Sequence, residues 1–153
     1  VEVERRTIVA CAPERAFAAV DDLAAYPAWM KLVHGVDSSA PSDGQPAWDV
    51  ELQAQVGPFA RSKRLRMVRV VHEPVFRVVF ERAETDGRQH SPWRLSVLLD
   101  STEAAGETAI TMQLTYGGNL WTGAVLERVL DDHVERGAAA LSALLAEPAL
   151  GDR

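Results

Sequence analysis

The sequence predicts an α+β fold in which a curved, seven-stranded antiparallel sheet wraps around one long C-terminal helix, with two short helices after the first strand. Three observations support this prediction. Apolar and polar side chains alternate in several segments between residues 33 and 116, as in strands buried on one face. Apolar side chains recur at helical spacing in residues 120–146. The 153 residues suit one domain, which we place at 1–148, followed by a frayed tail at 149–153.

A strand and two short helices are expected first. Residues 1–10 alternate loosely between apolar and polar side chains, which favours a strand. Pro13, followed by an acidic residue, is typical of a helix start and predicts a first helix over 12–20. The two aspartates at 21–22 can cap a second short helix at 23–26, because an aspartate side chain accepts hydrogen bonds from the first turn.

Six further strands are expected, separated by segments rich in Gly, Pro and Asp. Their expected bounds are 33–39, 48–56, 61–72, 75–84, 90–101 and 108–116. The alternation is clearest in 48–56. In 75–84, the side chains of Phe76, Val78 and Phe80 are expected on one face.

The long helix is expected to cross the whole sheet, because about 27 residues of helix span roughly 40 Å. The sheet must then curl around this helix, while the two short helices fill the gap at its open end. Such an arrangement rarely closes completely. We therefore expect an apolar cavity between sheet and helix, which is the usual setting of a ligand site. A structure with no cavity of about 300 Å³ or more would contradict both functions that depend on a ligand in this cavity.

Charge and cysteine content exclude several classes of function. The chain carries 16 Lys and Arg against 22 Asp and Glu, a net charge of −6, which argues against nucleic-acid binding. Cys11 is the only cysteine, which excludes an internal disulfide and a cysteine-based metal cluster. No run approaches the roughly 20 apolar residues of a membrane-spanning helix, and the first residues do not resemble a signal peptide. We expect a cytoplasmic monomer or homodimer with no cofactor and no bound metal.

Three short motifs resemble those of one protein family. They are Ala12-Pro13-Glu14-Arg15-Ala16-Phe17 at the first helix, Tyr26-Pro27-Ala28-Trp29-Met30 at the second, and Tyr116-Gly117-Gly118 before the long helix. Together with the order of elements over nearly the whole chain, they resemble the START-like, or SRPBCC, superfamily, and this resemblance implies the helix-grip fold. That superfamily contains polyketide cyclases and dehydratases, lipid carriers, hormone receptors and quinone-binding proteins. The resemblance therefore implies a fold and leaves the function open.

Two functions are compatible with the expected cavity. In the first, the chain binds a small hydrophobic ligand, which is a lipid, a polyketide-like aromatic or a quinone. In the second, a polyketide cyclase or dehydratase folds its substrate in the same cavity with one or two acid or base groups. We favour binding, because no pair of acid and base stands out in the sequence.

Residues with catalytic chemistry are few. The sequence lacks the motifs of nucleophilic and phosphate-binding sites, and its four histidines show no metal-ligand spacing. Weak catalytic candidates are Arg69, His90, Tyr116 and His133. His133 belongs to the apolar stripe of the long helix, where it faces the cavity or lies at the edge of the stripe beside Asp132.

The strand expected at 61–72 has two possible inner faces. Arg69 points inward if Leu65 and Met67 line the interior, and it points to solvent if the even-numbered valines do so instead. The sequence leaves both possibilities open, and a bulge would combine them. The basic residues of this strand are expected on a solvated edge or outer face, or in transient contact with a membrane surface or a partner. They are Arg61, Lys63, Arg64 and Arg66.

The cavity lining is expected from large side chains on the apolar faces of the strands and of the long helix. These residues are Trp48, Val50, Met67, Trp93, Leu95, Met112, Tyr116, Trp121 and His133. Aromatic side chains suit a planar hydrophobic ligand, since Tyr and Trp combine a large apolar ring with one polar atom. Met30 and Met67 would supply adaptable lining, whereas Trp29 is expected mainly to pack in the core.

Overall fold

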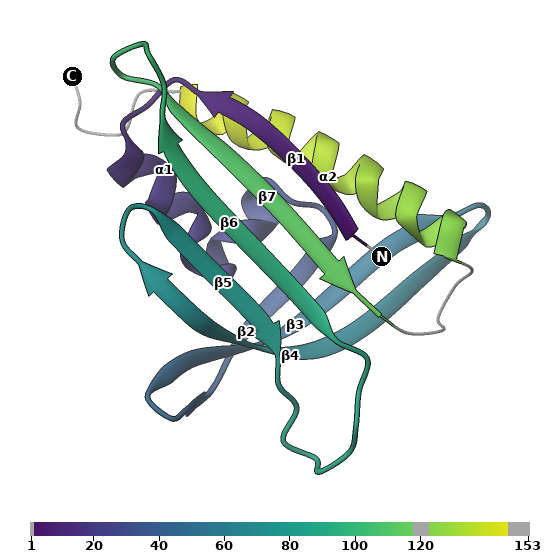
Figure 1. The fold of residues 1–153 in the computed structure, drawn as a ribbon. Helices are drawn as coiled ribbons and strands as arrows, with labels where there is room; N and C mark the ends of the chain where they lie inside the picture. The colour runs from purple at the N-terminus through teal and green to yellow at the C-terminus, as the bar shows by residue number, and fades with distance from the viewer. Residues whose placement is uncertain (1, 118–122, 147–153) are drawn as a thin grey trace.

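The computed structural model describes residues 2–117 and 123–146, which form one sheet and three helices (Figure 1). In chain order the elements are β1 (Glu2–Val9), α1 (Pro13–Val20), the 3₁₀ helix η1 (Leu23–Ala28), β2 (Val33–Ser42), β3 (Gln45–Val56), β4 (Phe59–Glu73), β5 (Arg77–Arg82), β6 (Trp93–Ser101), β7 (Thr108–Tyr116) and α2 (Gly123–Ala146). In this part of the chain no helix is both long enough and apolar enough to cross a membrane.

The sheet has the strand order β1-β7-β6-β5-β4-β3-β2, and every neighbouring pair is antiparallel. Strands β2 to β7 follow one another as hairpins, while β1 lies at the far edge beside β7. The two short helices therefore connect one edge strand to the other. Figure 1 shows α2 on the same side of the sheet as these helices, so this side, called the inner face below, carries the core.

The predicted α+β fold, with seven antiparallel strands, two short helices and a long C-terminal helix, is confirmed. The differences concern bounds. β2 extends to Ser42, and β3 and β4 both begin earlier than expected, because the two strands pair along their whole length. The second short helix is a 3₁₀ helix that continues through Pro27. Its aspartate cap is present, since the Asp22 side chain accepts a hydrogen bond from the Ala24 N–H at 2.8 Å.

A bulge in β4 explains why its inner face is ambiguous in the sequence. Leu65 and Met67 lie on the inner face and are buried, and the register against β5 shifts between Arg69 and Val71. Val68, on the opposite face, is also buried, so both alternating sets contribute to packing. The odd-numbered set faces the interior as far as the bulge.

The expectation that Phe76 shares a face with Val78 and Phe80 is wrong. β5 begins at Arg77, so Phe76 belongs to the preceding turn, and 63% of it is exposed. Val78 and Phe80 are both fully buried. A turn residue does not follow the alternation of the strand that it precedes.

Aromatic side chains occupy the centre of the core. Tyr26 of η1 contacts Phe80 edge-on with ring centroids 6.0 Å apart, and Phe80 contacts Trp48 in the same way at 5.7 Å. Trp29 is buried, as expected of a core residue, and its Nε1 donates to the Ala19 carbonyl at 3.2 Å. The buried apolar stripe of α2 completes this core with Leu130, Val134, Ala138, Leu141 and Leu145.

Candidate functional site

An apolar cavity lies between the inner face of the sheet, α2 and the segment around η1. The sheet contributes side chains from β2, β3, β4, β6 and β7, while α2 contributes Val134. The lining residues are Leu23, Tyr26, Met30, Leu32, Val33, Val50, Leu52, Leu65, Met67, Trp93, Leu95, Met112, Leu114 and Val134. None of these side chains carries a charge. The hydroxyl of Tyr26 donates to the Val20 carbonyl at 2.8 Å, so this polar atom is already satisfied inside the protein.

The cavity has a volume of about 60 Å³. The expectation of about 300 Å³ or more is therefore wrong, and in this conformation the cavity is too small for either of the two functions that depend on a bound ligand. Long side chains occupy much of the space that the backbone leaves between sheet and helix. All three methionines of the chain, Met30, Met67 and Met112, line the cavity. An unbranched methionine has three rotatable side-chain bonds, so these residues can make room without a change in the backbone.

Five of the residues expected to line the cavity do lie in its wall. They are Val50, Met67, Trp93, Leu95 and Met112. Met30, expected as adaptable lining, also lies in the wall. Trp121 lies outside the described residues.

Three other expected lining residues lie beside the cavity and not in its wall. Trp48 is buried against Phe80 in the aromatic core. Tyr116 is buried at the end of β7, where its ring lies 5.2 Å from that of Trp93. His133 is half-buried on α2, next to Val134. Its burial lowers the pKa of His133, and Arg136 lowers it further, although Asp132 acts in the opposite direction.

Several lining residues were missed by the sequence analysis, although a simple signal could have identified some of them. Leu52, Leu65 and Leu114 each lie two residues from an expected lining residue on the same strand, so they share its face. Tyr26 and Leu23 carried no comparable signal, because their place depends on how η1 packs against the sheet.

Arg69 lies on the inner side of β4, but its side chain donates a hydrogen bond to a backbone carbonyl and does not line the cavity. Its Nη1 donates to the Asp21 carbonyl at 2.8 Å, and the neighbouring His72 lies 3.3 Å from the Asp21 carboxylate. This contact joins β4 to the end of α1. The sequence left open whether Arg69 points inward or to solvent. In the structure it points inward and has a structural partner there.

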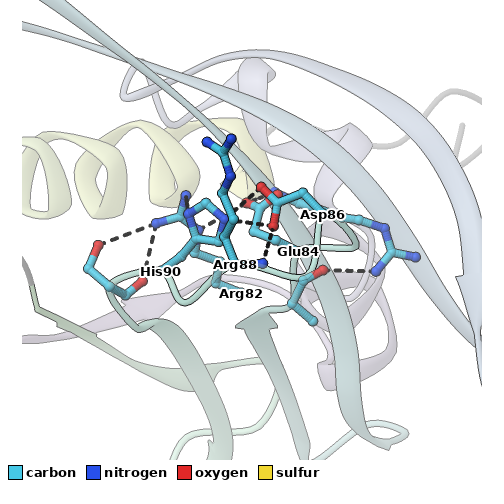
Figure 2. Close-up of polar contacts among 8 residues, drawn as sticks. Arg82, Glu84, Asp86, Arg88 and His90 are labelled. Carbon is cyan, nitrogen blue, oxygen red and sulfur yellow. Dashed lines mark hydrogen bonds and ion pairs between the residues drawn. The ribbon is translucent and has the colours of Figure 1, made fainter.

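His90 belongs to a polar cluster in the loop between β5 and β6 (Figure 2). Its Nε2 lies 2.8 Å from Asp86 Oδ2, and its Nδ1 lies 3.3 Å from Arg82 Nη2. Because an arginine can only donate, Nδ1 accepts and Nε2 carries the proton that is donated to Asp86. Hydrogen bonds from the Arg88 N–H and from His90 hold the pKa of Asp86 below its usual value.

Arg82 is the centre of this cluster, and only 8% of its side chain is exposed. Its Nε donates to Glu84 Oε1 at 2.9 Å, and its Nη1 donates to the carbonyl and the hydroxyl of Ser91 at 3.2 and 3.3 Å. Burial alone would raise the pKa of Glu84, but the hydrogen bonds from the Arg66 N–H and from Arg82 lower it below its usual value. The loop is thus fixed to the end of β5 by charged hydrogen bonds.

Arg66 corrects the expectation of a solvated basic strand. It is only 7% exposed, and its guanidinium donates to Ser39 Oγ, to the Ala83 carbonyl at 2.9 Å and to the Ala40 carbonyl. This side chain joins β2, β4 and the segment after β5. An arginine can be buried in this way because each of its three guanidinium nitrogens donates to an oxygen of the protein. Among the described residues, no group of three or more His, Cys, Asp and Glu is arranged to hold a metal ion.

Comparison with known proteins assigns the family. A model of the family described as polyketide cyclase / dehydrase and lipid transport matches residues 1–146. The chain is similar to the Zhui aromatase/cyclase from a Streptomyces species, with 13% identity and a TM-score of 0.69, covering 95% of this chain and 93% of that one. It is also similar to a START superfamily protein from Mycobacterium smegmatis, with 18% identity and a TM-score of 0.68, covering 94% and 96% of the two chains.

No curated protein matches the sequence significantly. The match over 1–146 shows that the chain belongs to the polyketide cyclase / dehydrase and lipid-transport family.

Proposed function

We propose that this protein binds a small hydrophobic ligand in the cavity between the sheet and α2. The observation that carries the proposal is the lining: every side chain in the wall is apolar or aromatic, and all three methionines of the chain are among them. Family membership supports the same function, since the family description includes lipid transport. The ligand class is a lipid chain, a polyketide-like aromatic or a quinone.

The ligand enters by displacing flexible side chains. An engineered apolar cavity of about 150 Å³ accepts benzene, so the present 60 Å³ must widen before a molecule of that size can bind. Rotation of Met30, Met67 and Met112 provides such widening at low cost. Burial of about 300 Å² of ligand surface gives on the order of 7 kcal/mol. Association costs offset part of this, so we expect affinities in the micromolar range.

Cyclisation or dehydration in the same cavity has less support from the site. None of the four candidate catalytic residues, Arg69, His90, Tyr116 and His133, is among the residues that line the cavity. A general acid or base must come within hydrogen-bond reach of the reacting group. Binding without chemistry is therefore the function that the lining favours.

The methionines provide a direct test. In protein labelled with ¹³C at the methionine methyl groups, Met30, Met67 and Met112 all report on the cavity wall. Titration with naphthalene or 1-octanol should shift all three methyl signals in one saturable process. Shifts that do not saturate, or methyl signals that stay in place, would refute the proposal.

A pair of variants on α2 locates the binding. Val134→Phe places a larger side chain in the wall and should abolish the saturable shifts. Leu144→Phe makes a similar change on an exposed part of the same helix and should bind like the unmodified protein. Thermal unfolding of both variants verifies that they are folded. Equal binding by the two variants would place the ligand elsewhere.

A further inference from the structure

Lys63 lies at the edge of the cavity, on the inner face of β4. Its partner across the strand pair is Leu52 of β3, and Leu65 is the next residue of β4 on the same face. Both leucines line the cavity. Because side chains alternate between the two faces of a strand, the Lys63 side chain projects from the same face as these leucines. A cationic group therefore borders an apolar wall.

Lys63 is half-buried, and its ammonium group makes no hydrogen bond or ion pair within residues 2–117 and 123–146. Burial lowers the pKa of Lys63, Arg82 lowers it further, and Glu84 partly offsets both effects. A charged amine that is withdrawn from water beside a second cation is unfavourable unless another group neutralises it.

The neighbouring charged groups are already engaged. Glu84 Oε1 accepts hydrogen bonds from the Arg66 N–H and from Arg82 Nε, both at 2.9 Å. The guanidinium of Arg82 is in turn held by Glu84, Ser91 and His90 (Figure 2). Of the two charged groups that act on the pKa of Lys63, Arg82 is positive and Glu84 is negative, and Glu84 is already hydrogen-bonded to Arg66 and Arg82. Lys63 is the group that still has donors to offer.

We propose that the hydrophobic ligand carries a carboxylate, which the Lys63 ammonium binds while the apolar part of the ligand occupies the cavity. This inference rests on the proposed function and narrows it to amphiphilic monoanions. A carboxylate would supply the acceptor that the Lys63 ammonium lacks among the described residues. Its hydrogen bonds to the ammonium are charge-assisted and thus among the stronger ones in proteins.

Two ligands that differ only in their end group test the inference. Octanoate and 1-octanol have equal chain length, and their dissociation constants are measured by calorimetry below the aggregation limit of either. Octanoate should bind the unmodified protein about tenfold or more tightly than 1-octanol. Lys63→Met should remove this preference and leave the affinity for 1-octanol within about twofold.

The other lysine of the chain supplies the control. Lys31 is exposed, and Lys31→Met should keep the full preference for octanoate. Lys63→Arg retains the charge and should keep most of the preference for octanoate. If only Lys63→Met loses this preference, the loss is due to the missing charge and not to misfolding. In protein with ¹³C-methylated lysines, which keep their charge, octanoate should shift the Lys63 signal while 1-octanol leaves it in place.

The outcomes separate this inference from the proposed function. Equal affinity of the unmodified protein for octanoate and 1-octanol overturns the role of Lys63 and leaves hydrophobic binding intact. A preference for octanoate over 1-octanol that survives in Lys63→Met also overturns the role of Lys63. Failure of both ligands to bind overturns the inference and the proposed function together.

Discussion

Gly137 of α2 packs directly against Met30 in the cavity wall. A Cβ atom added to Gly137 would lie 2.8 Å from both the Sδ and the Cε atoms of Met30 and 3.6 Å from the Trp29 carbonyl oxygen. The first two distances are shorter than contacts that real Cβ atoms make. The absence of a side chain at Gly137 thus leaves the space that the thioether of Met30 fills.

Gly137→Ala should therefore weaken ligand binding without unfolding the protein. The added methyl group displaces the end of the Met30 side chain from the space beside Gly137, and a shift of this side chain toward the cavity reduces the 60 Å³ that a ligand can use. Replacing glycine by alanine inside a helix contributes up to about 1 kcal/mol. Repacking of Met30 costs roughly 1–3 kcal/mol. We expect the free energy of unfolding in urea to change by less than about 2 kcal/mol and the affinity for 1-octanol to fall about tenfold.

A second glycine provides the matched control. A Cβ added to Gly35 of β2 meets nothing within 4 Å, and Gly35 does not line the cavity. Gly35→Ala should bind 1-octanol like the unmodified protein. If Gly137→Ala also kept its affinity, Met30 would not control the size of the cavity.

Arg66 and Arg64 should differ sharply in their contributions to stability, although both belong to the same face of β4. Arg66→Met removes the donors to the Ala83 and Ala40 carbonyls and leaves these acceptors without that partner. We expect a loss of about 2–4 kcal/mol in the free energy of unfolding, measured in urea.

Arg64→Met is the control for the loss of a positive charge at this face. The Arg64 side chain is 87% exposed, and its nitrogen lies 3.9 Å from the Glu51 carboxylate. An exposed pair of this kind contributes little, so we expect a change below about 1 kcal/mol. Equal effects of the two substitutions would show that charge, and not the buried hydrogen bonds, determines the role of Arg66.

The sequence was sufficient to predict the order and type of the elements, because each carried a local signal. Alternation identified strands such as β3, and the apolar stripe of residues 130, 134, 138 and 141 identified the buried side of α2. The bounds of η1 were not predictable in the same way. This helix continues through Pro27, and its Tyr26 packs against Phe80, which lies far away in the chain and leaves no local signal.

The site was only partly predictable, since it depends on contacts between distant segments. Strand alternation placed Val50, Met67 and Met112 in the cavity wall, but it could not give the volume that their side-chain rotamers leave. The burial of Arg66 was missed for a related reason. Its acceptors at residues 40 and 83 belong to β2 and to the segment after β5, and no local pattern in the sequence indicates that these two segments meet beside β4.

His133 should make the stability of the protein depend on pH. Burial lowers the pKa of His133 in the folded chain, and Arg136 adds to this effect against the opposing influence of Asp132. In the unfolded chain the imidazole titrates near 6.5. The unfolded state therefore takes up its proton at a higher pH than the folded state does. The contribution of the neutral imidazole is fully present above about pH 6.5 and is lost as the pH falls toward the folded pKa.

His133→Gln should remove this dependence. Measured by urea unfolding between about pH 7.5 and pH 5, the variant should gain stability relative to the unmodified protein as the pH falls, because glutamine has no proton to take up. The same substitution at His34, an exposed histidine of β2, controls for the loss of an imidazole as such. Parallel curves for His133→Gln and the unmodified protein would mean that the folded chain accommodates the imidazolium, and the partial burial of His133 on α2 would then carry no cost.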